Sequence, residues 1–200
     1  MVMAMNRRQR LVDTATEVIM EQGFAAASVD EICRRAGASK GSFYHFFESK
    51  SEIGEAVLEA WFTRVRAATE GGPYQTEGHP GKRLMGYVNH MKNLSPGLWG
   101  RGSVLAAVAT ELGGRESAVS EACRRLVGEA TSDASRLFEP ASESLDRSPT
   151  ARDLARLFLA VTEGAALLAR AEGRPELASD TLDTFQLCLK KILEYTPEPA

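Results

Sequence analysis

The sequence lacks the patterns that hold secreted domains and zinc proteins together. It has only three cysteines in 200 residues, Cys33, Cys123 and Cys188, which are far apart and include no Cys-x-x-Cys pair. An odd number of isolated thiols fits a reduced cytoplasm better than a disulfide framework or a zinc site. We therefore expect a cytoplasmic protein with no structural metal and no cofactor, whose cysteines are buried inside helices.

Long hydrophobic runs are also missing. A membrane-spanning helix needs about 18 consecutive apolar residues. The most hydrophobic segment, Leu154 to Leu168, is interrupted by Arg156 and Glu163. At the N-terminus the charges follow a short apolar start without a cleavage pattern, which argues against a secretory signal. No membrane partner is expected.

Neither the net charge nor the known catalytic motifs indicate a polycation or an enzyme. Lys and Arg number 24 against 27 Asp and Glu, a formal net charge of −3. This balance excludes a histone-like protein but not DNA binding, because a total says nothing about how charge is distributed. The sequence has no Gly-x-Ser-x-Gly, Walker lysine loop or His-Glu-x-x-His motif. We expect no catalytic residues and no enzyme activity.

Helical periodicity runs through nearly the whole chain, and hairpin signals are missing, so we expect an all-α fold. The first helix is predicted from about Asn6 to Gln22, and Gly23 stops it. The segment Gly71–Gly81, rich in glycine and proline, is predicted to be a flexible loop, and the tail Thr196–Ala200 is expected to fray. Further helices are expected near Lys82–Leu94, Gly102–Leu112, Glu116–Phe138, Thr150–Arg170 and Ala178–Tyr195, separated by Ser95-Pro96-Gly97, Gly113-Gly114, the Pro140–Pro149 stretch and Gly173-Arg174-Pro175.

Two short helices are predicted around a tight turn. Ser28 and Glu31 form a capping box that opens the first of them, and Gly37 ends it because a left-handed turn residue is most easily glycine. Ser39 then caps the second short helix, which runs through Phe47. A second capping box, which begins at Ser49, opens a longer helix that ends near residue 71.

The second short helix has two different faces. Phe43, Phe46 and Phe47 cluster on one side and are expected in the core, with Gly41 and His45 nearly opposite. Between residues 34 and 50, four cations meet a single carboxylate, so the local charge is +3 in an otherwise acidic chain.

This pattern is typical of a helix-turn-helix, whose second helix enters the major groove of DNA. Glycine at position 41 allows close approach to DNA, Tyr44 and Lys50 suit phosphate oxygens, and His45 suits a base edge or a phosphate. The amide ends of the helices that open after Ser28 and Ser49 also favour phosphate.

Residues Asn6 to about Trp61 resemble the N-terminal domain of the TetR family of bacterial transcriptional regulators. The resemblance rests on Ala26-Ala27-Ser28-Val29-Asp30-Glu31-Ile32, Ala36-Gly37-Ala38-Ser39-Lys40-Gly41-Ser42-Phe43-Tyr44-His45-Phe46-Phe47 and Ser49-Lys50. It implies a helix-turn-helix DNA-binding domain at 1–50, joined through the helix at about 50–70 to a helical ligand-binding and dimerisation domain within 51–200. It implies DNA contacts around Ser28, Ser39, Lys40, Gly41, Ser42, Tyr44, His45 and Lys50.

The resemblance also implies a homodimer formed by the last two long helices of each subunit. Two apolar stripes agree with this, although stripes of this kind are more often intramolecular core than interface. They consist of Leu154, Leu157, Phe158, Val161, Ala165 and Leu168, and of Leu182, Phe185, Leu189 and Ile192. A dimer would place two recognition helices about 34–36 Å apart, or a multiple of one DNA turn, on a near-palindromic operator of double-stranded DNA.

By the same resemblance, a small organic effector enclosed by the C-terminal helices is expected to release a repressor from DNA. The candidate ligand residues are aromatic, Met or polar side chains, although side chains of this kind are more often plain core or surface: Trp61, Phe62, Met85, Tyr87, His90, Met91, Trp99, Phe158 and Thr162. Ser103 stands where some members of the family carry a cysteine, which weakens a redox-sensing alternative. A helical protein-binding adaptor with weak DNA affinity is the other alternative.

Overall fold

The computed structural model describes residues 2–112, 117–142 and 149–194. Every regular element in these ranges is a helix, which confirms the expected all-α fold. The elements are α1 (Val2–Gln22), α2 (Val29–Ala36), α3 (Lys40–Phe46), α4 (Lys50–Thr69), a 3-10 turn η1 (Pro73–Thr76), α5 (Pro80–Trp99), α6 (Val104–Leu112), α7 (Ala118–Ser142), α8 (Ala151–Glu172) and α9 (Leu177–Glu194). Within these ranges no helix has the length and apolar character needed to span a membrane.

Contacts divide the chain into two compact units. The first comprises Met1–Arg64 and Ser103–Leu126, and the second comprises Val65–Gly102 and Val127–Ala200. The first unit therefore contains α1 to α3, most of α4, α6 and the start of α7. The second unit contains η1, α5, the rest of α7, α8 and α9.

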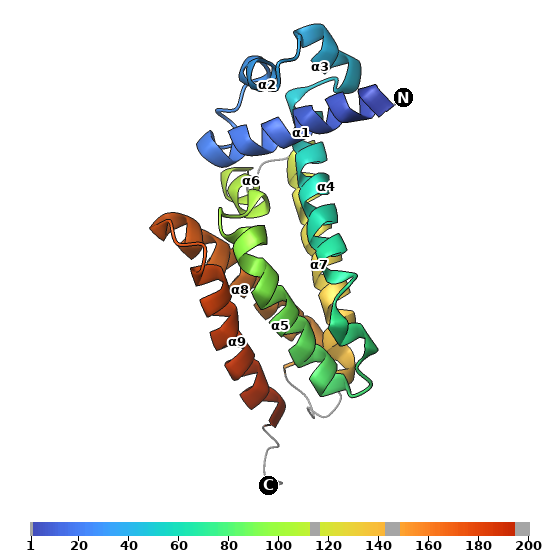
Figure 1. Ribbon diagram of the computed structural model, residues 1–200, viewed down its shortest axis with the longest axis vertical. Coiled ribbons are helices and arrows are strands. Elements are labelled where there is room, and N and C mark those ends of the chain that lie inside the picture. Colours follow the sequence, from blue (N-terminus) through green and yellow to red (C-terminus); the bar gives the residue numbers. More distant parts are fainter. Residues whose placement is uncertain (1, 113–116, 143–148, 195–200) are drawn as a thin grey trace. The chain divides into compact units, whose positions relative to one another are not determined.

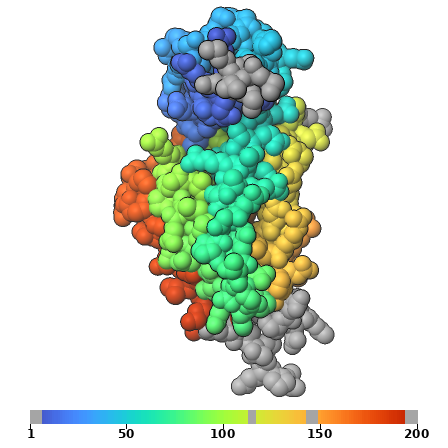
Figure 2. All heavy atoms as spheres, turned by 45° about the vertical axis from the view of Figure 1, so that its right-hand side comes forward, coloured from blue at the N-terminus to red at the C-terminus, as the bar shows by residue number. Residues whose placement is uncertain are grey.

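Helix α1 forms the base on which α2 and α3 of the first unit pack. Its apolar stripe, Leu11, Ala15, Val18 and Ile19, is at most 2% exposed. Figure 1 shows α2 and α3 on one side of α1, and Figure 2 shows the dark-blue side chains of α1 packed against lighter-blue neighbours. The helix begins at Val2, earlier than the expected Asn6.

The aromatic side chains of α3 and its end fill much of the core of the first unit. Phe43 and Phe47 are fully buried, as expected, and their rings lie 5.6 Å apart. Phe46 is only half-buried, so its assignment to the core was wrong in part. Its ring lies 4.8 Å from that of exposed His45.

A glycine allows α4 to approach the turn after α1 closely. A Cβ atom at Gly54 would lie only 2.5 Å from Cε2 of the buried Phe24 ring. Real Cβ atoms do not come this close, because interiors are packed to van der Waals contact. Gly54 therefore fixes how near α4 lies to Phe24.

The predicted capping boxes form only in part. The Oγ atoms of Ser28 and Ser49 accept hydrogen bonds from the backbone N–H groups of Glu31 (3.1 Å) and Glu52 (3.2 Å). The second bond of each box, from the N–H of the cap residue to the glutamate side chain, is replaced by other contacts. The Glu31 carboxylate accepts from two neighbouring arginines, and the Glu52 carboxylate accepts from the N–H of Glu48, one residue before the cap.

In the second unit, α9 runs beside α5 and α8, as Figure 1 shows in red, green and orange. Their contact is apolar, with Leu84, Met91, Leu182 and Leu189 at most 1% exposed. Helix α8 starts with a complete capping box between Thr150 and Asp153 and ends at Gly173, whose φ of 65° is left-handed. The predicted separator at residues 173–175 is thus confirmed.

The predicted separator at Ser95-Pro96-Gly97 was wrong, because α5 continues through it to Trp99. Proline lacks an N–H and leaves the carbonyl four residues earlier without its helical partner. Here that carbonyl belongs to Lys92, and it accepts a hydrogen bond of 2.7 Å from the Ser95 hydroxyl. The side chain just before the proline thus replaces the missing backbone bond.

The segment Gly71–Gly81 was expected to be a flexible loop, but it contains η1 and a buried anchor. Tyr74 is 6% exposed, and its hydroxyl donates to the Thr69 carbonyl at 2.7 Å. A buried aromatic ring that is also hydrogen-bonded holds such a segment in place. Helix α7 likewise runs past Phe138 to Ser142 and includes Pro140. The Gly113-Gly114 separator and the 196–200 tail lie outside the described residues.

Candidate nucleic-acid interface

The turn between α2 and α3 has the geometry that the sequence predicts. Gly37 adopts the left-handed conformation (φ 61°, ψ 37°), and the N–H of Ala38 donates to the Cys33 carbonyl at 2.9 Å. Ser39 then caps α3, with its Oγ accepting from the N–H of Ser42 at 3.1 Å. A left-handed glycine followed by a new cap two residues later makes the tight turn of a helix-turn-helix.

Helix α3 presents its polar side to solvent. Tyr44 is 55% exposed, with its ring edge-on to the buried Phe43 at 5.3 Å, and His45 is also exposed. The contact with Phe43 positions the Tyr44 ring, while the exposed part of the side chain remains in solvent. An exposed, positioned hydroxyl is suited to a phosphate oxygen.

Among the residues that the structure describes, none packs closely against Gly41. A Cβ atom there would meet only Ser39 Oγ, at an ordinary 3.9 Å, and its φ is not left-handed. Glycine inside a helix costs about 0.5–1 kcal/mol relative to alanine. The protein therefore accepts this cost where no neighbour in its own chain requires it, as expected where another molecule approaches the backbone.

The serines of the predicted interface act mainly through the backbone. The hydroxyls of Ser28 and Ser39 accept hydrogen bonds at the starts of α2 and α3 and remain exposed. Ser42 is half-buried. The two caps leave hydroxyl hydrogens available to donate outward, next to the first amides of each helix.

The local charge of +3 that residues 34–50 carry in the sequence is largely neutralised in the structure by carboxylates from outside this window. Its window leaves out Glu21, Asp30 and Glu31, which pair with the cations. Four ion pairs result: Arg34 with Glu31 at 2.7 Å, Arg35 with Glu31 at 2.6 Å, Arg35 with Glu21 at 2.5 Å, and Lys40 with Asp30 at 2.7 Å. Hydrogen bonds from the two arginines lower the pKa of Glu31 to about 2. The hydrogen bond to Asp30 raises the pKa of Lys40.

Lys50 is bound inside the first unit. Its Nζ donates to the Ala25 carbonyl at 2.7 Å and lies 4.8 Å from the centre of the Phe24 ring. Partial burial lowers its pKa. In this arrangement the ammonium group stabilises the turn after α1, and the sequence pattern contained no signal for that contact.

Glu111, at the end of α6, holds the same turn from the other side. Its two carboxylate oxygens accept hydrogen bonds from the backbone N–H groups of Phe24 at 2.6 Å and Ala25 at 2.7 Å. These amides lie beyond the end of α1 and have no helical partner of their own. The sequence reasoning did not identify Glu111, because the contact spans more than 80 residues of chain.

Comparisons with known proteins agree with this geometry. Residues 11–57, which include α2, α3 and the turn, match the family described as bacterial regulatory proteins, tetR family. This part of the chain is therefore similar to the DNA-binding domain of tetR-family regulatory proteins.

Relatives in the TetR family extend the match beyond the first unit. The transcriptional repressor DhaR of Mycobacterium sp. strain GP1 is 31% identical over 105 residues, which is 52% of each chain. The transcriptional regulator AcuR of Cereibacter sphaeroides is 28% identical over 88% of this chain and 82% of its own. A crystal structure of a regulatory protein TetR from Rhodobacter sphaeroides, 26% identical, superposes with a TM-score of 0.74 over 90% of this chain and 96% of its own.

These similarities support a DNA-binding transcriptional regulator similar to the TetR family, as the resemblance implied. The redox-sensing and adaptor alternatives are not favoured. Cys33 and Cys123 are buried, and burial raises the pKa of both thiols. Cys188 is exposed on α9, so its expected burial was wrong. Ser103 is buried and caps α6, with its Oγ accepting from the N–H of Ala106 at 3.3 Å.

Most of the expected ligand residues lie in the core of the second unit. Tyr87 contacts Tyr74 at 5.3 Å and Phe158 at 5.4 Å between ring centres, and His90 donates from Nε2 to the Ala68 carbonyl at 2.8 Å. Met91, Trp99 and Thr162 are buried, and Met85 is half-buried. Trp61 and Phe62 belong to the first unit.

The indole N–H of Trp99, at the end of α5, differs from the other polar groups among these residues. It is buried and has no hydrogen-bond acceptor among the residues that the structure describes. A buried donor without an acceptor costs about 1–3 kcal/mol. A bound molecule with a hydrogen-bond acceptor can therefore accept a hydrogen bond from the Trp99 N–H.

The two predicted dimerisation stripes are divided between core and surface. Six of their residues are buried within the second unit: Leu154, Phe158, Ala165, Leu182, Phe185 and Leu189. Leu157 (43%) and Leu168 (47%) are exposed, and Val161 and Ile192 are half-buried. Leu167 and Leu187, which the sequence reasoning did not select, are both 65% exposed.

Proposed function

We propose that this regulator is a homodimeric repressor that binds a near-palindromic operator and leaves it when a small organic molecule binds. Residues 1–50 supply the DNA contacts, and residues 51–200 supply effector binding and dimerisation. The observation that carries DNA binding is the α3 surface. It combines a glycine that its own chain does not require with an exposed, ring-supported tyrosine.

The DNA contacts come from the polar side of the helix-turn-helix. Gly41 lets the helix backbone approach the duplex, while Tyr44 and His45 reach phosphates or base edges. The caps Ser28 and Ser39 direct the first amides of α2 and α3 toward phosphates. Lys40 joins them by exchanging Asp30 for a phosphate, which is feasible because an exposed ion pair is worth only about 0–1 kcal/mol.

A second copy of the chain covers the exposed apolar face of α8. Leu157, Leu168 and Leu167 lie on this face with Gly164, where a Cβ atom would meet nothing within 4 Å. Open space beside a small residue permits close helix approach, and exposed leucines at helical spacing are typical of an interface. The two copies are related by twofold symmetry, which matches a palindromic operator.

The effector is proposed to be an organic molecule with a hydrogen-bond acceptor. The aromatic cluster around Tyr87 and Phe158 provides apolar walls, and the unpaired Trp99 N–H provides a polar anchor. Binding releases DNA only if the effector has a higher affinity for the conformation that does not fit the operator.

The test is a titration of the purified protein with DNA that flanks its own gene, beside a scrambled duplex, at two salt concentrations. Preferential binding that weakens as salt rises supports the proposal. The variant Tyr44→Ala should lose the preference while its thermal melt stays nearly unchanged, because the side chain is exposed. The proposal is refuted if the wild-type protein binds the flanking and the scrambled duplex equally and weakly, and also shows no preference among fragments selected from the whole genome.

A further inference from the structure

The cations in the first half of α1 differ from those of the helix-turn-helix in whether they form ion pairs. Arg7, Arg8 and Arg10 are exposed, and none of them forms an ion pair with a carboxylate in the described part of the chain. By contrast, Arg34, Arg35 and Lys40 are each paired with a carboxylate, and Lys50 is bonded to a backbone carbonyl. The free positive charge of this region therefore lies on α1.

Two contacts place these arginines next to the helix-turn-helix. The Arg8 guanidinium lies 5.0 Å from the centre of the Phe47 ring, at the end of α3. Arg10 lies by the turn, because a Cβ atom at Gly37 would be 3.3 Å from Arg10 Nη2. The first half of α1 is thus beside both ends of the segment that reads DNA.

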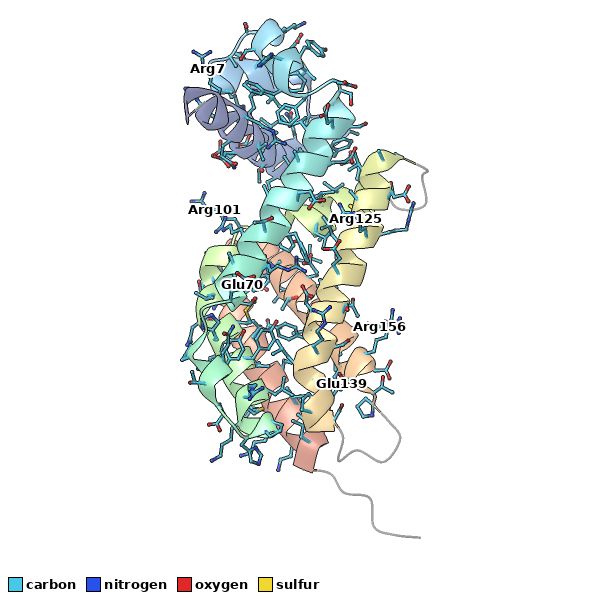
Figure 3. All side chains as sticks on the ribbon, turned by 90° about the vertical axis from the view of Figure 1, so that its right-hand side faces the viewer. Arg7, Glu70, Arg101, Arg125, Glu139 and Arg156 are labelled. Atoms are coloured by element: carbon cyan, nitrogen blue, oxygen red, sulfur yellow. The ribbon has the colours of Figure 1, made fainter. Side chains whose placement is uncertain are left out.

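Stability of α1 does not explain this charge. A helix favours carboxylates at its start and cations at its end, but α1 has no acidic residue in its first turn and no basic residue in its last. Its arginines lie in the first half, and its carboxylates Asp13, Glu17 and Glu21 follow in the second. Arg8 packs on a ring, whereas Arg7 and Arg10 have no such contact. Figure 3 shows the Arg7 side chain extending away from the ribbon of α1.

We propose that Arg7 and Arg10 form a phosphate-binding site that extends the DNA interface onto α1. The inference rests on the proposed function, since it requires that the helix-turn-helix binds DNA. Residues three apart lie on one side of a helix, with Cβ atoms about 5–6 Å apart, so both guanidinium groups face the same stretch of backbone. Arginine suits this role because its planar group donates to two phosphate oxygens at once.

The gain in free energy when a cation binds a phosphate depends on what the cation contacts before DNA binds. A cation already paired with a carboxylate gains little from a phosphate, because it exchanges one anion for another and leaves the carboxylate near DNA. Arg7 and Arg10 give up only water. They should therefore release a larger share of the DNA counterions than the paired cations do, and this share is measured by the dependence of affinity on salt.

The experiment compares salt dependence in the double variant Arg7→Gln/Arg10→Gln with that in the wild-type protein. Each phosphate contact contributes about 0.9 to the slope of log affinity against log salt for B-DNA, so the slope should fall by about 1.8. Between about 50 and 200 mM salt the wild-type protein should then lose about twelvefold more affinity than the variant. The loss should be equal for flanking and scrambled duplexes, because phosphates carry no sequence information.

Two control variants make the result specific. Arg152→Gln/Arg156→Gln removes the same charge from exposed positions of α8 in the second unit and should leave the slope unchanged. Arg7→Lys/Arg10→Lys keeps the charge and should retain most of the slope. An unchanged slope in the glutamine variant, or an equal fall in the α8 control, overturns the inference, as does a loss of operator preference without a change in slope. If the wild-type protein binds no duplex in a salt-dependent way, the proposed function fails as well.

Discussion

The carboxylate of Glu111 provides a sharp test of how the first unit is held together. It accepts two backbone hydrogen bonds in the turn after α1, at 2.6 and 2.7 Å. A hydrogen bond to a charged group contributes about 1.5–3 kcal/mol when buried. One of these bonds is exposed and the other is only part-buried, so each is expected to contribute less than this range, about 1 kcal/mol. We expect Glu111→Ala to lower the free energy of unfolding by about 2 kcal/mol in total.

That loss corresponds to a measurable change in melting temperature. For a chain of this size, 1 kcal/mol shifts Tm by about 2–4 °C, so the variant should melt about 4–8 °C lower, as followed by circular dichroism. Glu111→Gln keeps one acceptor oxygen and loses the charge, so about half of the effect is expected. Hydrogen exchange should locate the change, because the amides of Phe24 and Ala25 lose protection in the alanine variant.

The matched control is Glu121→Gln, which alters an exposed carboxylate of α7 in the same unit. The Glu121 side chain has no hydrogen bond or ion pair within the described residues, so its replacement should change Tm little. The reasoning is refuted if Glu111→Ala melts together with this control and the exchange of the two amides stays as in the wild-type protein.

Two further predictions follow from the helix-turn-helix. Gly41→Ala should raise Tm slightly, by the roughly 0.5–1 kcal/mol that glycine costs in a helix, and should weaken operator binding at least tenfold in a fluorescence titration; unchanged binding would show that DNA does not approach this backbone. The pKa of Glu31 is lowered from 4.5 to about 2, so its ion pairs with Arg34 and Arg35 should persist through pH 4.5 and be lost only as the pH falls through about 2. Carboxyl chemical shifts in an NMR titration check this, and a midpoint near 4.5 would contradict it.

Local chemistry made much of the fold and of the recognition element predictable. Gly37 and Ser39 act on the turn that contains them, so their conformations follow from a few neighbouring residues. The expected break at Pro96 was wrong because its outcome depends on whether another group satisfies the Lys92 carbonyl. Proline alone indicates an end, and the Ser95 hydroxyl before it allows the helix to continue.

Contacts between residues far apart in the chain could not be read from the sequence. Glu21 pairs with Arg35 across 14 residues, and Lys50 bonds to the carbonyl of Ala25 across 25. Both contacts reduce the free positive charge of the DNA-binding surface. A count of charged residues between positions 34 and 50 therefore overestimates this charge. The side of α9 that carries Cys188 is likewise decided by which face packs on α5 and α8, and the helical pattern alone leaves that choice open.

The close contact between Gly54 and Phe24 has a consequence for the evolution of this family. A methyl group at position 54 collides with the ring at position 24, so the two positions share one fixed volume. A relative with a larger residue at the position of Gly54 can keep this helix spacing only with a smaller residue at the position of Phe24. The sizes of these two residues should therefore vary in opposite directions among homologues, although 30 positions separate them in the chain.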